Sequence, residues 1–241
     1  MTTSTPETAG EPAAQTKAQI TRERIYSCAM ELFTSHGYDK TTMRMIADQA
    51  NVNVALSYYY FPSKEHLVLE FYRNFNHDFI QRSAAVLQNS SSLAARLTAV
   101  TETMFAVAAP YHTFASSLFA TAASPASPLH PFSAEYTDIR TDGIALFARV
   151  IDGCTPRVPK DMAEELPFLL WSLNLGLMYC WMHDQSEHQE KTRTILRQLV
   201  RMLTGLLRLS SSPGARSFRR QITSISHLIR ASLPPPDGGT A

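Results

Sequence analysis

The chain is short of glycine, and this shortage removes several classes of enzyme. Only 9 of its 241 residues are glycine, and they form no loop able to cradle a phosphate. There is no GxSxG segment, and no Ser-His-Asp or Cys-His arrangement can be assembled from local spacing. We therefore expect the protein not to be an enzyme and to carry no cofactor.

Cysteine is equally scarce. Cys28, Cys154 and Cys180 are widely spaced, lie among apolar residues and include no CxxC pair, so we interpret them as reduced thiols in a core rather than a redox pair. His183 and His188 flank a helix break five positions apart, so they do not share a helix face as in HExxH. No metal site is predicted, and an exposed turn is expected there.

Long apolar runs are also missing. No stretch approaches the length that spans a membrane, and no charged segment followed by an apolar run opens the chain. The sequence therefore predicts a cytoplasmic protein with no membrane partner. Alternation of period two is absent as well, so we expect no strand and an all-α fold.

The chain has no excess charge of either sign. Lys and Arg total 22 against 21 acidic residues, and residues 20–66 hold five of each. Neutralised phosphates supply much of the affinity of nucleic-acid binding, so this balance argues mildly against such a role. A few well-placed cations can still support it, and Arg44 and Lys64 lie at predicted helix starts, where they can face a phosphate backbone.

Residues 41–67 carry the clearest local pattern, two short helices about a tight turn. Thr42 is a good N-cap for a helix whose apolar residues recur at helical spacing until Asn51 interrupts it. Asn53 can cap a second helix over residues 54–60, because its side chain can accept backbone N–H groups of the next turn. This arrangement is a helix-turn-helix.

The flanking segments are predicted to be helical too. A helix opening at Thr21 and ending at Gly37 would pack across the helix-turn-helix, and Ser63 would cap a long helix over residues 64–88. Further helices are expected from Leu93 to Pro110, over residues 111–122, and from residue 132 or 133 to Gly153.

Two later segments carry specific boundary signals. Pro167 either kinks a helix over residues 160–184 or places its start near Leu166. Ser186 and Gln189 match a capping box that would begin a helix over residues 187–209.

The predicted organisation places a three-helix head before a helical body. The segments are a disordered tail (1–18), a helix-turn-helix head (19–66), a helical body (67–209), a linker (210–215), an additional amphipathic helix (216–233) and a second tail (234–241). For the amphipathic helix we prefer a role in covering the body over extending a dimer contact or touching an acidic partner.

The head resembles a known family at many positions in matching order and spacing. These are Arg24-Ile25, Ala29, Leu32-Phe33, Gly37-Tyr38, Thr41-Thr42, Ile46-Ala47, Ala50, Val52, Tyr58, Phe61, Ser63-Lys64-Glu65 and Leu67. In this run the chain is similar to the DNA-binding domain of the TetR repressor family. It departs from the usual residues of that family at Asn51, Asn53, Ala55, Leu56 and Ser57, so its base preference does not transfer.

The resemblance implies which residues meet DNA. Tyr58 and Tyr60 or its neighbour would contact the backbone, Lys64 would hold a phosphate, and other side chains would approach base edges. Three consecutive tyrosines point in different directions around a helix, so they cannot all be core. The full predicted set is Thr42, Arg44, Asn53, Val54, Leu56, Tyr58, Tyr59, Tyr60 and Lys64.

The resemblance also implies that residues 19–66 are a DNA-binding domain and that residues 67–209 are a ligand-binding and dimerisation domain, which encloses an apolar pocket for an effector. Aromatic residues and methionines at helical spacing are more often ordinary core, and only the resemblance favours a ligand role for them. The predicted ligand-binding residues are Met104, Phe105, Tyr111, Phe114, Phe119, Phe147, Trp171 and Met178.

The function expected from the sequence is that of a ligand-responsive transcriptional repressor. It would bind a palindromic double-stranded DNA operator as a homodimer and be released by a small apolar or aromatic effector. Two alternatives stay open: regulation by a partner protein instead of a small molecule, and a helical enzyme or carrier that keeps the head as scaffold.

Overall fold

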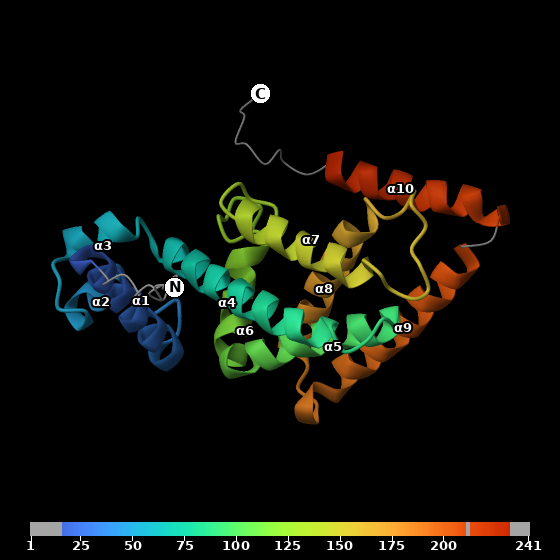
Figure 1. Cartoon of the computed structure of the whole chain (residues 1–241). Helices are drawn as coiled ribbons and strands as arrows, with labels where there is room; N and C mark the ends of the chain where they lie inside the picture. Colours follow the sequence, from blue (N-terminus) through green and yellow to red (C-terminus); the bar gives the residue numbers. More distant parts are fainter. Residues whose placement is uncertain (1–15, 211–212, 232–241) are drawn as a thin grey trace, which may run out of the picture. The chain divides into compact units, whose positions relative to one another are not determined.

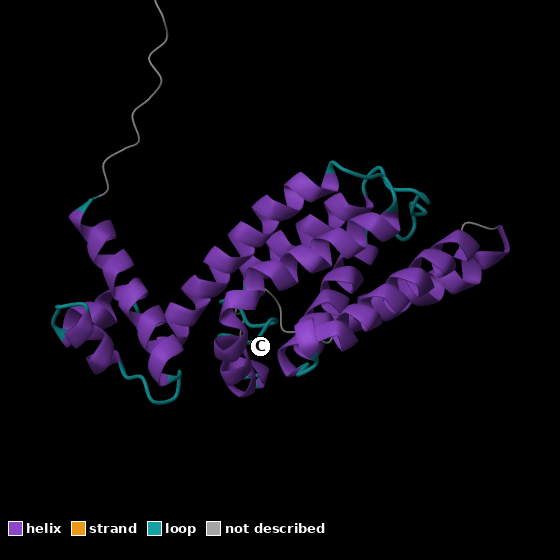
Figure 2. Ribbon diagram, turned by 90° about the horizontal axis from the view of Figure 1, so that it is seen from below, coloured by secondary structure: helices purple, strands orange, loops and turns teal. Residues whose placement is uncertain are grey.

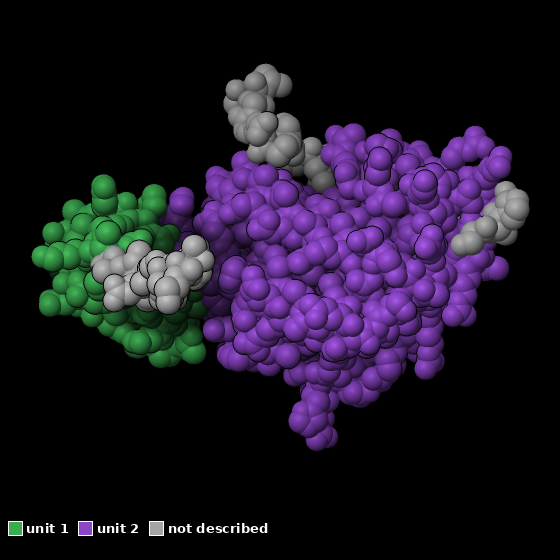
Figure 3. All heavy atoms as spheres, viewed as in Figure 1, with its two compact units in different colours: residues 1–62 green, residues 63–241 purple. Residues whose placement is uncertain are grey.

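Two compact units make up the computed structural model, which describes residues 16–210 and 213–231. The units are Met1–Pro62 and Ser63–Ala241 (Figure 3). Every regular element in the described ranges is a helix, apart from a single bridge between Ser92 and Thr155 (Figure 2). The all-α fold class is confirmed. Of the predicted tails, residues 234–241 and most of residues 1–18 lie outside the described residues.

The first unit consists of helices α1 (Lys17–His36), α2 (Met43–Gln49) and α3 (Val54–Tyr60). The prediction that the first helix opens at Thr21 was wrong, because Thr16 and Gln19 form a capping box that starts it four residues earlier. Each of their side chains accepts the backbone N–H of the other, which satisfies donors left unpaired at the helix start.

Apolar side chains from α1 and α2 form the core of this unit. Ile25, Ala29 and Phe33 of α1 and Ile46 and Ala47 of α2 are at most 1% exposed. The α1 residues recur every four positions and Ile46 and Ala47 are neighbours in α2, so each set lies on one face of its helix, and burial of these faces packs the helices together.

The second unit begins with α4 (Lys64–Leu87), which packs against α5 and α7 (Figure 1). Helix α7 also packs on α8, and α5 also packs on α9. The other elements are α5 (Leu93–Ala108), η1 (Ala109–Tyr111), α6 (His112–Ala123), α7 (Thr137–Ile151), α8 (Leu166–His183), η2 (Glu187–Gln189), α9 (Glu190–Ser210), η3 (Pro213–Ala215) and α10 (Arg216–Ala231). No helix among the described residues is long and apolar enough to cross a membrane.

The starts of α8 and α7 follow from a proline and from a run of turns, respectively. Helix α8 starts at Leu166 with Pro167 in its first turn, where a missing N–H costs no helical hydrogen bond. Helix α7 begins at Thr137 and not at residue 132 or 133, because successive turns such as His130 N–H to the Ser127 carbonyl (3.0 Å) occupy the segment before it.

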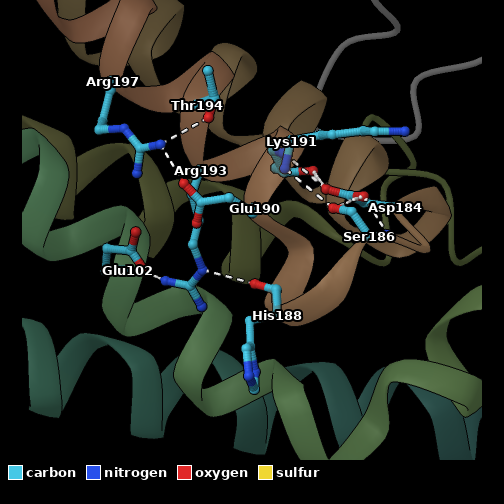
Figure 4. Close-up of polar contacts among 10 residues, drawn as sticks. Glu102, Asp184, Ser186, His188, Glu190, Lys191, Arg193, Thr194 and Arg197 are labelled. Carbon is cyan, nitrogen blue, oxygen red and sulfur yellow. Dashed lines mark hydrogen bonds and ion pairs between the residues drawn. The ribbon is translucent and has the colours of Figure 1, made fainter.

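The capping box predicted at Ser186 and Gln189 does not form. His188 and Gln189 have positive φ values of 51° and 53°, which break the regular helix, and α9 begins at Glu190. Asp184 takes over the capping function: its carboxylate accepts the backbone N–H and the hydroxyl of Thr192, both at 2.8 Å. The same carboxylate accepts the N–H and hydroxyl of Ser186 (Figure 4).

Helix α10 exists as predicted and covers part of the second unit. The Glu165 side chain, only 6% exposed at the start of α8, accepts a hydrogen bond from the Ser226 hydroxyl and pairs with Arg230 at 3.4 Å. Arg230 also lies over the Phe168 ring at 4.7 Å. These contacts favour the covering role. Of the predicted linker, Ser210 belongs to α9, residues 213–215 form a short 3-10 turn, and residues 211–212 are not described.

Candidate nucleic-acid interface and ligand cavity

The backbone conformation of Asn51 determines the turn between α2 and α3. Asn51 adopts φ of 52°, in the left-handed region that asparagine tolerates better than most residues. The Val52 N–H reaches the Ala47 carbonyl at 3.0 Å and the Asn51 N–H reaches the Asp48 carbonyl at 3.2 Å. This pair of bonds is the Schellman ending of a helix, so asparagine performs here the task that glycine usually performs.

Both predicted N-caps of the helix-turn-helix form. The Thr42 hydroxyl accepts the Met45 N–H at 3.2 Å, and the Asn53 side-chain oxygen accepts the Leu56 N–H at 2.7 Å. Ser63 precedes α4 as predicted, but its hydroxyl contacts His66 Nδ1 at 2.9 Å and caps no backbone N–H. Local backbone hydrogen bonds therefore close the turn, and the Asn53 side chain fixes the start of α3.

One face of α3 is left open to solvent. Ala55, Tyr58 and Tyr59 are exposed, at 49% for Tyr58 and 78% for Tyr59, and their spacing of three and four positions places them side by side. Ser57 is fully buried on the opposite side and donates to the Val54 carbonyl at 2.8 Å. The serine found where the family usually has a larger apolar residue thus packs inward.

The other predicted DNA-binding residues differ in how accessible they are. Thr42, Arg44 and Asn53 are exposed, whereas the remaining members of the set are partly buried. Those are Val54, Leu56, Tyr60 and Lys64. Lys64 is the first residue of α4 and belongs to the second unit. Ala55, which sequence analysis did not include, shares the exposed face of α3, and its position three residues before Tyr58 is the signal that identifies it.

A cavity of about 580 Å³ lies within the second unit. Helix α4 contributes a continuous wall to it, because side chains at spacings of four residues point the same way. These are Phe71, Tyr72, Phe75, Asn76 and Phe79. Parts of α5, α6, α7, α8 and the segment before α7 complete the lining, which is mostly aromatic and aliphatic. Its volume lies in the range of small-molecule sites.

The predicted ligand-binding residues divide between this cavity and the core. Met104, Tyr111, Trp171 and Met178 line the cavity. Phe105, Phe114 and Phe147 are buried elsewhere: for example, Phe105 stacks on Trp181 with ring centroids 5.9 Å apart. The Phe119 side chain lies outside the described part of the chain. The α4 residues were missed because their apolar stripe also fits an ordinary connecting helix.

Two tyrosines from different helices meet at the cavity wall. Tyr72 of α4 and Tyr136 before α7 contact each other edge to face, with ring centroids 5.8 Å apart. Burial raises the pKa of both phenols well above the usual value, and the neighbouring Tyr136 raises that of Tyr72 further. Both side chains therefore carry their proton at neutral pH and can donate hydrogen bonds.

Gly143 allows α7 to approach the indole of Trp171 closely. A Cβ atom at this position would lie 2.7 Å from Trp171 Nε1, so Gly143→Ala must displace a large side chain of the cavity wall. We expect the free energy of unfolding to fall by about 1–2 kcal/mol in urea unfolding followed by circular dichroism. Gly176→Ala is the matched control, since no atom lies within 4 Å of its added Cβ.

The control should behave in the opposite way. Gly176 lies inside α8 and lines the same cavity, so replacing it with alanine should stabilise the protein by about 0.5–1 kcal/mol through helix propensity. Equal stabilities of the two variants would show that the close approach of Gly143 to Trp171 carries no cost.

Both units match known families of bacterial regulators. Residues 25–71 match the family described as "Bacterial regulatory proteins, tetR family". Residues 96–221, more than half of the chain, match "Tetracyclin repressor-like, C-terminal domain". The first match covers the helix-turn-helix and the second covers most of the unit that contains the cavity.

Individual relatives agree with this assignment. The probable HTH-type transcriptional regulator YttP of Bacillus subtilis is 43% identical over 60 residues, 23% of this chain and 29% of that protein. The chain spans between 22% and 42% of the length of the curated relatives it matches.

Solved structures share the fold over longer stretches. The FadR repressor of Thermus thermophilus, solved in complex with lauroyl-CoA, superposes with a TM-score of 0.54 at 18% identity, covering 74% of this chain and 92% of that one. A tetR-family regulator from Streptomyces coelicolor has a TM-score of 0.58 at 19% identity and covers 91% of both chains. From the match of both units to its family models, the chain belongs to the TetR family of bacterial transcription regulators.

Proposed function

We propose that the protein is a ligand-responsive repressor that binds a palindromic operator as a homodimer and releases it when a small apolar or aromatic effector enters the cavity. The observation that carries the proposal is that α4 both lines the cavity and directly follows the DNA-reading helix in the chain. Five of its side chains wall the cavity, and the helix begins only four residues after the last residue of α3 in the chain. An effector that shifts α4 thereby acts on the element next to the DNA-reading helix.

The exposed face of α3 supports the DNA-binding part of the proposal. Tyr58 and Tyr59 place two phenols in solvent, where they can donate to phosphate oxygens, and Arg44 adds an exposed cation. The capped, short α3 can then enter a major groove as the recognition helix of a helix-turn-helix. Acting on DNA, the protein would work in the cytoplasm.

Exposed apolar side chains on α9 support a homodimer. Four apolar side chains of α9 are between 37% and 70% exposed, although other residues of the same helix are buried in the second unit. They are Ile195, Met202, Leu206 and Leu209. An apolar stripe of this kind is costly in water and is typical of a surface that a second subunit covers. Two copies would place two heads on the half-sites of a palindrome.

The cavity favours a small molecule over a partner protein as the regulator. A space of about 580 Å³ lined by rings and methionines is concave and suited to a compact apolar compound. The Thermus FadR repressor was solved in complex with lauroyl-CoA, so acyl compounds are among those to be tested here.

The proposal predicts sequence-specific binding to the protein's own upstream DNA. Fluorescence anisotropy with a labelled duplex should show two chains bound per site, with an affinity that falls steeply between about 50 and 200 mM salt because counterions are released. Equal affinity for a scrambled duplex, or no binding at the lower salt concentration, would contradict the DNA-binding function. Operator binding without release by any cavity ligand would instead favour regulation by a partner protein.

A further inference from the structure

The cavity lining contains no side chain with a permanent charge. Among the described residues that form it there is no aspartate, glutamate, lysine or arginine. A carboxylate or phosphate placed inside would lose its water without gaining a counterion, which is strongly unfavourable. The lining therefore selects against charged compounds.

Two nearby ionic groups are already engaged by the protein. The Arg140 guanidinium donates to the Pro131 carbonyl at 2.8 Å and to the Thr137 hydroxyl at 3.0 Å. Asp138 pairs with Arg73 at 2.7 Å. Arg140 and Asp138 are thus bound by other protein groups near Tyr136, and neither residue lines the cavity.

His130 is the only histidine among the described residues of the lining. Its Nδ1 atom lies 3.2 Å from the Phe132 N–H and accepts that hydrogen bond. An acceptor nitrogen carries no proton, so this bond requires a neutral ring whose proton is on Nε2. In this arrangement His130 offers a donor and no positive charge.

Three polar side chains gather at one part of the wall. Tyr72 and Asn76 are four residues apart on α4 and so lie on the same face, and Tyr136 contacts the Tyr72 ring. Asn76 is only 9% exposed, and its amide N–H donates to the Ile139 carbonyl at 3.5 Å. We call Tyr72, Asn76 and Tyr136 the polar triad.

The triad has unused hydrogen-bonding capacity. Within the described chain, the phenolic oxygens of Tyr72 and Tyr136 and the side-chain oxygen of Asn76 have no hydrogen-bond partner. Asn174, the other amide of the lining, differs because its oxygen accepts from Thr101 at 3.3 Å and its N–H contacts Met104 Sδ at 2.8 Å. The lining thus presents two donors and an acceptor at one place and apolar surface over most of the rest.

We propose that the cavity takes an uncharged ligand with an apolar, ring-containing body and a hydroxyl or carbonyl oxygen, and that the polar triad holds this oxygen. The phenols donate to the oxygen, and Asn76 accepts from it when it is a hydroxyl. The rings of Phe71, Phe75 and Trp171 contact the body. This inference rests on the proposed function, since it names the class of compound that would act as effector.

A matched series of three probes tests the inference on the full chain. Phenanthrene supplies a ring body alone, 9-phenanthrol adds one neutral oxygen, and phenanthrene-9-carboxylate adds a charge. Each is titrated against the neutral fluorophore N-phenyl-1-naphthylamine bound to the protein. We expect 9-phenanthrol to bind about fivefold more tightly than phenanthrene, as one hydrogen bond gives, and the carboxylate at least about tenfold more weakly than 9-phenanthrol.

Variants of the triad locate the oxygen. The double variant Tyr72→Phe/Tyr136→Phe should lose the preference for 9-phenanthrol and keep the affinity for phenanthrene, because only the hydroxyls are removed. Tyr26→Phe is the control, since it removes a tyrosine hydroxyl from a residue of the first unit that does not line the cavity, and it should keep the preference. An unchanged preference in the double variant would overturn the role of the triad.

The test separates this inference from the proposed function. If the carboxylate or lauroyl-CoA displaces the fluorophore more tightly than 9-phenanthrol, the neutral ligand class is wrong, although an effector-responsive repressor remains supported. Failure of every compound, including the fluorophore, to bind would overturn the inference as well. In either case, anisotropy with the upstream duplex reports separately whether the protein binds DNA.

Discussion

Replacing Asp184 with alanine is expected to lower the free energy of unfolding of the second unit by about 3 kcal/mol. The carboxylate is 8% exposed and accepts four hydrogen bonds, two from Ser186 and two from Thr192, at 2.6–2.9 Å. Without it the Thr192 N–H and hydroxyl, in a residue that is 1% exposed, are left without an acceptor. Such buried donors cost about 1–3 kcal/mol each.

Urea unfolding followed by tryptophan fluorescence measures this effect directly. Both tryptophans of the chain, Trp171 and Trp181, lie in the second unit, so the signal does not include the head. Asp142→Ala is the control: it removes an exposed aspartate from the same unit and should change stability by less than about 0.5 kcal/mol. A loss below about 1 kcal/mol for Asp184→Ala would show that the cap is dispensable.

The contribution of Asp184 should also depend on pH. Burial alone would raise its pKa, but the four hydrogen bonds outweigh burial and hold the pKa well below the usual range. A carboxyl whose pKa is lower in the folded state stabilises the protein above its unfolded value of about 3.9. The stability difference between the native protein and Asp184→Asn is therefore expected to be constant from pH 5 upward and to shrink as the pH falls below about 4.

Local signals in the sequence identified the parts of the fold that neighbouring residues determine. Thr42 and Asn53 cap their helices, and Pro167 marks the start of α8, because each acts on backbone groups within one turn of itself. The same reasoning failed at Ser186 and Gln189. There Asp184, eight positions before Thr192, competes for the N–H groups, and residue spacing does not reveal which acceptor will reach them.

Contacts between distant segments explain what the sequence could not predict. Glu165 holds α10 through residues more than sixty positions away, and Gly143 is required by the indole of Trp171 on another helix. Of the residues that line the cavity, Met104, Trp171 and Met178 were among those predicted, whereas Tyr72, Asn76 and Tyr136 were not. A tyrosine or asparagine on an amphipathic helix is ordinary by itself, and only the packing of α4 against α7 brings these three together.

Changing Tyr58 to alanine is expected to weaken operator binding by about 150-fold or more. One hydrogen bond from a phenol to a charged phosphate contributes about 1.5 kcal/mol at the low end, and a homodimer loses it in both heads, which doubles the loss. Tyr58 is 49% exposed, so the head should remain folded. Anisotropy titrations with the upstream duplex measure the affinity, and circular dichroism checks the fold.

Lys64 is expected to act through its charge, which gives Lys64→Ala a different signature from Tyr58→Ala. Removing one phosphate contact per head should reduce the slope of log affinity against log salt by about 2 for the dimer, whereas Tyr58→Ala should leave the slope nearly unchanged. Lys191→Ala, which removes the same charge from an exposed residue of α9, controls for net charge and should keep both slope and affinity.

If Tyr58→Ala and Lys64→Ala both bind the operator as tightly as the native protein, the surface assigned to DNA is wrong. If Tyr58→Phe binds as weakly as Tyr58→Ala, the hydroxyl carries the contact, because the ring is still present.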